Sequence, residues 1–178
     1  MTWTASNPVS IGDATKKSHY DAVWDNIDML KVLQVVDTQT GAVGSGAGTI
    51  PIDDTIPEKT EGDEYFTLAI TPSSATNLLK IDVVFLATAD AVGHMTVGLF
   101  QDTTTNALAA STHAIRTAGD LCMISFTHWM TAGTTSATTF KVRAGLNNAA
   151  TTTMNGAAAA RLLGGVASSS ITISEIRP

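Results

Sequence analysis

The sequence predicts a mainly β protein, an antiparallel β-sandwich of about eight strands. Residues 79–87 alternate the apolar Leu79, Ile81 and Val83 with more polar neighbours, a two-residue period typical of a half-buried strand. Similar segments, separated by turn residues, occur at residues 65–71, 95–101, 121–130, 139–146 and 169–176. No helix-length pattern lies between them, which disfavours a parallel α/β sheet.

Weaker strand segments near Ile52, Ala110 and Ala159 bring the total to about eight, the number expected for a jelly roll. Residues 157–163 have some helical propensity, but glycines on both sides leave little room for a stable helix. We therefore expect strand or irregular structure there.

Composition excludes several function classes. The 178 residues are enough for a core without disulfides, and the net charge of −6 disfavours a nucleic-acid or anionic-membrane partner. No apolar run approaches the roughly 20 residues of a membrane span, and the start lacks the features of a signal peptide. We expect a protein made in the cytoplasm without membrane insertion. The single cysteine, Cys122, lies among apolar residues and is expected to be a buried, inert thiol.

Residues 1–37 differ from the rest and are interpreted as an anchoring and trimerisation segment, an extended arm followed by one amphipathic helix. Apolar residues at spacings of three and four predict one helix face: Tyr20, Val23, Trp24, Ile27 and Leu30. They fit only about two heptads, fewer than a secure coiled coil needs. The helix therefore depends on packing against neighbours.

The arm before this helix contains Trp3, Val9 and Ile11, with Val9 and Ile11 in alternation after an Asn-Pro step that favours extended backbone. An arm ending in a tryptophan suits a docking segment. The alternative is that Trp3 packs back onto the helix or the sandwich.

Residues 38–48 are rich in glycine and are interpreted as a linker to a β domain at residues 49–178. Gly44 and Gly46 have a spacing found in phosphate-binding loops. Such a loop requires a helix directly after it, whereas the segment that follows is extended.

Several segments resemble a domain found at the C-termini of many bacteriophage tail-fibre and other virion-surface proteins. The first is IPIDDTIPEKTEG at residues 50–62, and the others lie at residues 68–72, 74–83, 99–102, 106–110 and 170–176. In that family the domain is a trimeric jelly roll without catalytic machinery. The resemblance implies that the Asp-Asp-Thr-Ile-Pro element shapes the first loop.

No catalytic residue, metal site or cofactor is predicted. The histidines, His19, His94, His113 and His128, have no ligand-like spacing, although His94 or His128 of three chains could meet on a three-fold axis. The acidic region holds Asp53, Asp54, Glu58, Glu61, Asp63 and Glu64. Paired carboxylates there could serve hydrolysis or bind calcium, but we interpret the region as a solvated turn.

Arg116, His128 and Trp129 form a possible ligand surface, on which a ring would stack against a sugar. We favour the alternative that Trp129 is a core residue, because aromatic side chains dominate core burial.

These observations together predict a non-enzymatic virion protein of a bacteriophage, a homotrimeric surface knob anchored to other phage proteins by its N-terminal segment. It would serve as a head decoration, a head fibre or a short fibre tip. The alternative is a tail-fibre adhesin for a host glycan or protein. If Met1 is the natural start, a helix of about 20 residues reaches only about 30 Å, which is too short for a shaft and favours decoration.

Overall fold

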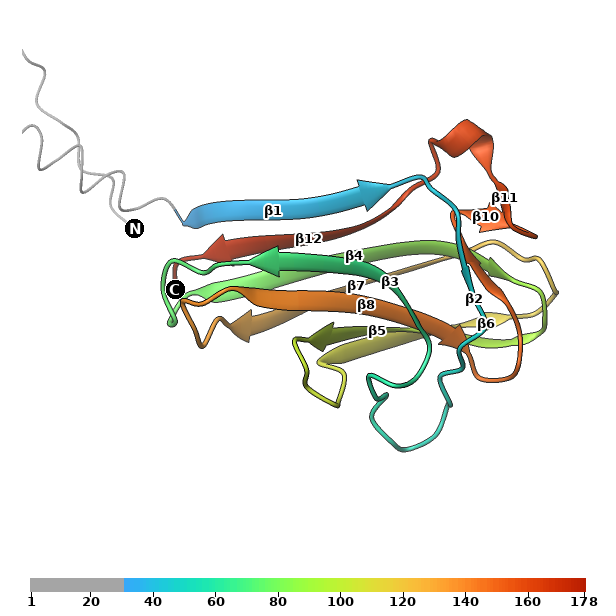
Figure 1. Ribbon diagram of the computed structural model, residues 1–178, viewed down its shortest axis with the longest axis horizontal. Helices are drawn as coiled ribbons and strands as arrows, with labels where there is room; N and C mark the ends of the chain where they lie inside the picture. Colours follow the sequence, from blue (N-terminus) through green and yellow to red (C-terminus); the bar gives the residue numbers. More distant parts are fainter. Residues whose placement is uncertain (1–30) are drawn as a thin grey trace, which may run out of the picture.

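The computed structural model describes residues 31–178, which form two antiparallel β-sheets packed face to face (Figure 1). The long strands of the first sheet, in spatial order, are β1 (Val32–Thr40), β12 (Ser169–Ile176), β4 (Leu78–Ala89) and β7 (Cys122–Thr131). Those of the second are β3 (Asp63–Ile70), β8 (Thr138–Leu146), β5 (Gly93–Gln101) and β6 (Ala109–Ile115). The predicted mainly β, antiparallel sandwich is confirmed.

Short strands complete the first sheet at one end. Strands β2 (Gly44–Gly46) and β9 (Thr152–Met154) pair with each other, and β9 continues along β4 beyond the end of β12. A small hairpin of β10 (Gly156–Ala157) and β11 (Ala160–Arg161) follows, and then a 3-10 turn at Leu163–Gly165. The expectation of strand or irregular structure over residues 157–163 is therefore confirmed.

The chain changes sheet at almost every connection between long strands. Among these strands, only β5 and β6 are consecutive in the chain and also neighbours in one sheet. The first described strand, β1, pairs along its length with the last, β12. This pairing is extended by the Arg177 amide, which donates to the Lys31 carbonyl at 2.7 Å.

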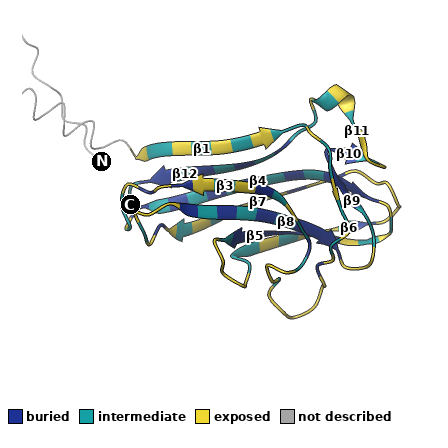
Figure 2. Ribbon diagram, viewed as in Figure 1, coloured by how far each residue is buried: buried dark blue, intermediate teal, exposed yellow. Residues whose placement is uncertain are grey.

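The core lies between the sheets and consists of alternate residues from their facing sides. Phe85 of β4 and Phe140 of β8 are fully buried there, and Figure 2 shows the buried residues along the middle of the strands. The ring of Tyr65 meets that of Phe85 edge-on, with 5.1 Å between centroids. Cys122 is buried against the same core, as predicted. Burial raises the pKa of its thiol to about 11.

A second apolar contact lies outside the sandwich, where a loop covers the outer face of the second sheet. Phe100 alternates with the core residue Leu99 on β5 and so points outward, yet it is only 1% exposed. The loop of residues 51–62 runs beside that of residues 102–108, and the Ala107 amide donates to the Pro57 carbonyl at 2.9 Å. Ile52 lies in this loop and is 48% exposed, so the strand predicted near it is wrong.

One buried carboxylate closes the end of the sandwich where β1 starts and β12 ends. Glu175 is fully buried, and its oxygens accept hydrogen bonds from the Ser73 amide at 2.8 Å, the Ser73 hydroxyl at 2.7 Å, Asn77 and Gln34. Burial disfavours the charged form, but these donors outweigh it and hold the pKa of Glu175 at about 2. Glu175 thereby ties β1 and the loop before β4 to β12.

The prediction of a glycine-rich linker at residues 38–48 is wrong. Residues up to Thr40 continue β1, and Gly44–Gly46 form β2. A side chain at Gly46 would collide with the Asp63 carboxylate, and one at Gly48 would collide with the Gly62 backbone. These glycines permit close packing of the segment against the sandwich. The β domain therefore begins at β1, and residues 32–37, assigned to the anchoring segment, are also part of it.

The predicted arm residues Trp3, Val9 and Ile11 and the predicted helix from Tyr20 to Leu30 lie outside the described residues. Within residues 31–178, no helix has the length and apolar character that a bilayer crossing requires.

Candidate functional site

The residues predicted as a ligand surface are not brought together. Arg116 follows β6 and lies beside Val92 and His94. Trp129 lies near the far end of β7. It is seven residues beyond Cys122, the first residue of the strand, and the distance between them along an extended strand is about 23 Å. His128, the neighbour of Trp129 in the chain, points to the opposite face of the sheet and is half-buried. Burial lowers the pKa of this imidazole.

Trp129 is not a core residue, and that prediction is wrong. Its side chain is 51% exposed on the outer face of the first sheet, opposite Lys80 of β4. The other residues on its face of β7 are Met123, Ser125, Thr127 and Thr131, which are also exposed. The inward face of β7 carries Cys122, Ile124, Phe126, His128 and Met130 instead.

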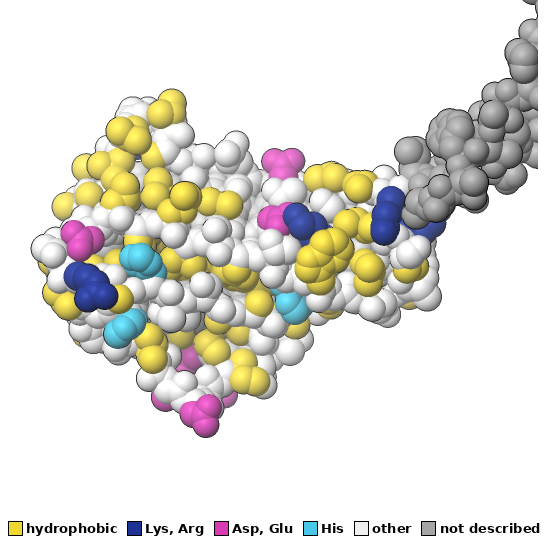
Figure 3. Space-filling model, turned by 180° about the vertical axis from the view of Figure 1, so that it is seen from behind, with side chains coloured by type: hydrophobic (Ala, Val, Ile, Leu, Met, Phe, Trp, Pro, Cys, Tyr) yellow, Lys and Arg dark blue, Asp and Glu magenta, His cyan; other side chains and the backbone are white. Residues whose placement is uncertain are grey.

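Strands β6 and β7 themselves contain no charged residue, although the ion-paired Lys80 and Asp82 of β4 lie directly beside Trp129 and Thr127. Their sequences, AASTHAI and CMISFTHWMT, contain no Asp, Glu, Lys or Arg. The two strands lie next to each other, each at one end of its sheet. Figure 3 views the molecule from behind, the side on which these strands lie in Figure 1. Hydrophobic and uncharged groups fill much of this view, and charged groups occur in a few small clusters.

The free edge of β7 lacks the usual protection against association. Exposed edges are commonly blocked by charged side chains, proline or a bulge. β7 has none of these, its ten residues pair with β4 without a register shift, and no second strand partners it within residues 31–178. Met123, 65% exposed, and Trp129 add apolar area beside this edge.

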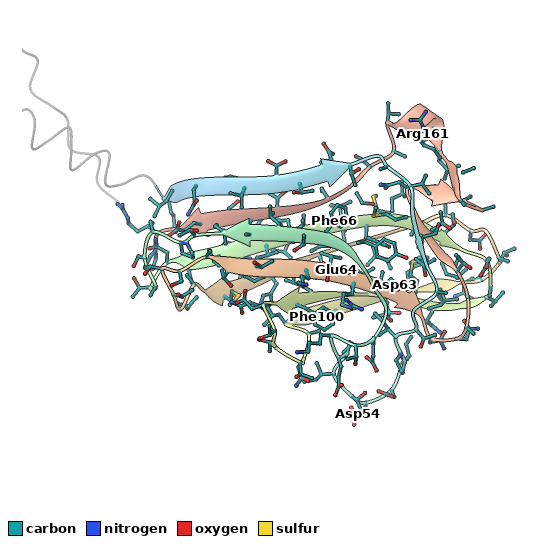
Figure 4. All side chains as sticks on the ribbon, viewed as in Figure 1. Asp54, Asp63, Glu64, Phe66, Phe100 and Arg161 are labelled. Carbon is teal, nitrogen blue, oxygen red and sulfur yellow. The ribbon has the colours of Figure 1, made fainter. Side chains whose placement is uncertain are left out.

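The acidic region is tied into local structure. Asp53 accepts hydrogen bonds from the amide and hydroxyl of Thr55, which lower the pKa of this carboxyl. Asp63 accepts from the Gly48 amide, and Glu64 forms an ion pair with Lys141 at 2.9 Å. Figure 4 shows Asp54 at the tip of the loop, away from Asp63 and Glu64. No group of three or more potential metal ligands occurs in the described part of the chain.

A pocket of about 510 Å³ lies at the end of the first sheet far from Glu175. Its floor contains Ser45 of β2, Thr153 of β9 and Thr88 of β4, which occupy one row across three paired strands. The hydroxyls of Ser45 and Thr153 are 3.3 Å apart, and that of Thr88 donates to the Gly156 carbonyl at 2.9 Å. These residues come from distant parts of the sequence, so no local pattern could have indicated the row.

Alanine methyl groups form the walls of the pocket, and one carboxylate lies at its rim. The walls include Ala118 and the hairpin residues Ala157, Ala158 and Ala159. Asp90 accepts a hydrogen bond from the Thr151 amide at 2.7 Å, which is the main reason that the pKa of this exposed carboxyl is lowered. The Asp90 amide in turn donates to the Thr151 carbonyl at 3.1 Å. The rim is therefore held by backbone hydrogen bonds.

The hairpin over the pocket has a strained backbone. Ala158 and Ala159 form its two-residue turn, with φ values of 47° and 62°. Positive φ at both central positions characterises a type I′ turn, which favours Asn-Gly over alanine. Asn155 at the base of the hairpin is fully buried and donates to the Thr40 and Ala42 carbonyls. The strained turn is thus fixed to the end of β1.

No family model matches the sequence, and no curated protein matches it. Among solved structures, the chain is similar to Eiger TNF from S. frugiperda, with 8% identity, a TM-score of 0.45, and coverage of 79% of this chain and 92% of that one. It is also similar to the EclA C-terminal domain, a sugar-binding protein, with 14% identity, a TM-score of 0.37, and coverage of 82% and 81%. A third similar structure is that of infectious bursal virus-derived T=1 particles, with 14% identity, a TM-score of 0.36, and coverage of 82% and 36%. All three scores are below 0.5, so no function is transferred from these proteins.

Proposed function

We propose that this chain is a non-enzymatic structural protein of a bacteriophage virion, a homotrimeric knob on the particle surface. The observation that carries the proposal is the β6–β7 edge, whose two strands contain no charged residue and whose Met123 and Trp129 are exposed. Unprotected edges and exposed apolar groups favour association with another chain. The proposal assigns a second and third copy of the chain as the partners of this side.

Charge supports self-association through this side. Around a closed symmetry axis, each subunit meets copies of itself, so charged residues near the axis approach residues of the same sign. The chain has a net charge of −6, and the opposite edge of the sandwich carries Asp37 on β1 and Glu64 on β3. Self-contact through the β6–β7 edge keeps these carboxylates away from the axis, and the Asp82 charge beside β7 is balanced by Lys80.

The strand order supports the finer fold assignment that the resemblance implies. Sheets ordered β1-β12-β4-β7 and β3-β8-β5-β6, with the chain crossing between them, have the arrangement expected of a jelly roll. In this proposal residues 1–30 contain the anchor to other phage proteins, and the protein resides on the virion surface without a cofactor. The resemblance of residues 50–62 and 170–176 to phage fibre domains is the reason for assigning it to a virion.

The trimer is tested by sedimentation equilibrium of the full chain and two variants. Ser125→Glu places a carboxylate on the exposed face of β7, whereas Thr67→Glu places one on exposed β3, at the opposite edge of the second sheet. We expect a mass of three chains for the wild type and Thr67→Glu, and dissociation for Ser125→Glu. A monomeric wild type, or equal masses for all three proteins, would contradict the proposed interface.

The place in the particle is tested by cryo-electron microscopy of virions, with copy number from mass spectrometry. Many copies at capsid symmetry positions would establish decoration. A few copies at the tail would favour the second candidate, a tail-fibre adhesin that binds a host glycan or protein. The observation that favours this alternative is the preformed pocket between β4, β9 and the β10–β11 hairpin.

A further inference from the structure

The pocket at the end of the first sheet has the size and lining of a small-molecule site. Its 510 Å³ lie within the roughly 300–1,000 Å³ typical of ligand pockets. Such sites combine mostly apolar walls with a few placed polar groups. Here the alanine methyls supply the walls, and the hydroxyls of Ser45, Thr88 and Thr153 supply the polar floor.

The lining excludes several ligand classes. No Lys, Arg or His contributes to it, and the Asp90 carboxylate lies at the rim, so an anionic ligand would lack a counter-charge and meet repulsion. A purely apolar ligand would displace water from the hydroxyl row without replacing its hydrogen bonds, which is unfavourable. A cofactor with a large aromatic ring would find no aromatic side chain on which to stack.

The remaining class is a neutral ligand that presents both C–H surface and hydroxyl groups. A sugar ring has this combination: its axial C–H groups form an apolar patch, and its hydroxyls both donate and accept. The Ser45 and Thr153 hydroxyls hydrogen-bond to each other at 3.3 Å, and the exposed Ser45 hydroxyl keeps capacity for a further bond to a ring hydroxyl. The Thr88 hydroxyl is only slightly exposed and donates to the Gly156 carbonyl, so it fixes the floor against the hairpin.

Backbone strain provides a second, independent observation at the same place. Ala158 and Ala159 hold positive φ values that alanine rarely adopts, and both line the pocket. Strained residues persist where the surrounding structure imposes them, and they cluster at ligand sites. At this turn the strain places two methyl groups over the hydroxyl row, where glycine or asparagine would give a different wall.

We propose that the pocket bounded by Ser45, Thr88, Thr153 and the β10–β11 hairpin binds a neutral sugar unit. The inference does not require the trimer, because every lining residue belongs to one chain. Sugar binding there would favour the adhesin alternative, whereas its absence would not affect the decoration role. Failure of the sugar test therefore leaves the proposed structural role intact, and the reverse also holds.

The test is a titration of the 15N-labelled full chain, followed by NMR, with the methyl glycosides of glucose, galactose and N-acetylglucosamine. N-acetylneuraminic acid serves as the anionic comparison. We expect at least one neutral glycoside to shift the amide signals of Gly119 and Ala157, and the acid to leave them unchanged. Titration to about 50 mM detects dissociation constants in the millimolar range.

Paired variants locate the binding. Ala118→Phe fills the pocket and should abolish the shifts, whereas Ala137→Phe, in an exposed loop outside it, should not. Ser45→Ala should weaken binding by about threefold to tenfold, the usual effect of losing one hydrogen bond, and Ser125→Ala should not. The inference is overturned if no neutral glycoside shifts the pocket amides, if the acid binds equally well, or if Ala118→Phe binds like the wild type.

Discussion

Replacing Glu175 with glutamine tests the role of the buried carboxylate in joining the ends of the β domain. In the wild type, one carboxylate oxygen accepts from the Ser73 amide, the Ser73 hydroxyl and Asn77, and the other accepts from Gln34. Glutamine keeps one acceptor oxygen but presents an NH2 group in place of the other. That group faces the Gln34 amide nitrogen, which also donates to the Thr71 carbonyl at 2.8 Å, so two donors oppose each other.

The expected loss follows from the pKa difference. A fall from an ordinary value of 4.5 to about 2 corresponds to about 3 kcal/mol of stability at neutral pH, because each pKa unit is equivalent to about 1.4 kcal/mol. Glutamine keeps one acceptor oxygen for part of these donors, so we expect a loss of about 2 kcal/mol. For a chain of this size, that lowers the melting temperature by about 4 to 8 °C.

The sign of the pH dependence makes the prediction specific. Because the folded-state pKa is depressed, Glu175 stabilises the protein above about pH 4.5, and this contribution disappears as the pH falls towards about 2. The difference between the wild type and Glu175→Gln should therefore narrow over this interval, as measured by urea unfolding at a series of pH values. Glu64→Gln, which removes an exposed ion pair with Lys141, is the matched control and should cost less than about 1 kcal/mol.

A gap between the wild type and Glu175→Gln that stays constant from pH 7 to pH 3 would refute this reasoning. Such a result would mean that the side chain stabilises through shape and neutral hydrogen bonds alone. Equal losses for the Glu175 and Glu64 variants would show that burial and the number of donors do not control the effect.

Three further predictions concern backbone conformation and thiol reactivity. Gly48→Ala should destabilise the protein by about 2 kcal/mol, because its Cβ would collide with neighbouring backbone, whereas Gly44→Ala meets only ordinary contacts and should cost far less in the same urea experiment. Ala158→Asn combined with Ala159→Gly should raise the free energy of unfolding by about 1–2 kcal/mol by relieving positive φ at alanine; an unchanged value would argue against the strained turn. Cys122, buried and with its thiol pKa raised to about 11, should react with a thiol reagent at neutral pH only after unfolding, so rapid labelling of the native protein would contradict its placement in the core.

The sequence identifies the strands well where one face is buried and the other is polar. β4 is the clearest case, because Leu79, Ile81, Val83 and Phe85 alternate with half-buried residues over its length. The sequence does not predict β1, because this strand directly follows a strong helical pattern and its apolar residues show no simple alternation. The glycines after it have the composition of a flexible linker, and only the tertiary contacts explain why side chains are excluded there.

The face of Trp129 could have been predicted from its own strand. Ser125 and Thr127 share its face, and two polar residues at the centre of a strand mark the solvent side, whereas Ile124 and Phe126 mark the core. In this strand the alternation is a better guide to burial than the size of the aromatic ring. The pocket could not have been predicted, since its hydroxyl row depends on the register of β2, β9 and β4.

The pairing of β1 with β12 gives the domain a direction. Val32, Ile176 and Leu78 lie together at one end, whereas Ala89, eleven residues along β4, lies at the other end beside the pocket, about 36 Å away. A tether entering through residue 31 would hold the domain by the end near Glu175 and leave the opposite end facing outward (Figure 1). Attachment to a sensor surface through either terminus should therefore keep the pocket accessible, and an insertion at the β10–β11 turn would project from the end opposite the point of attachment.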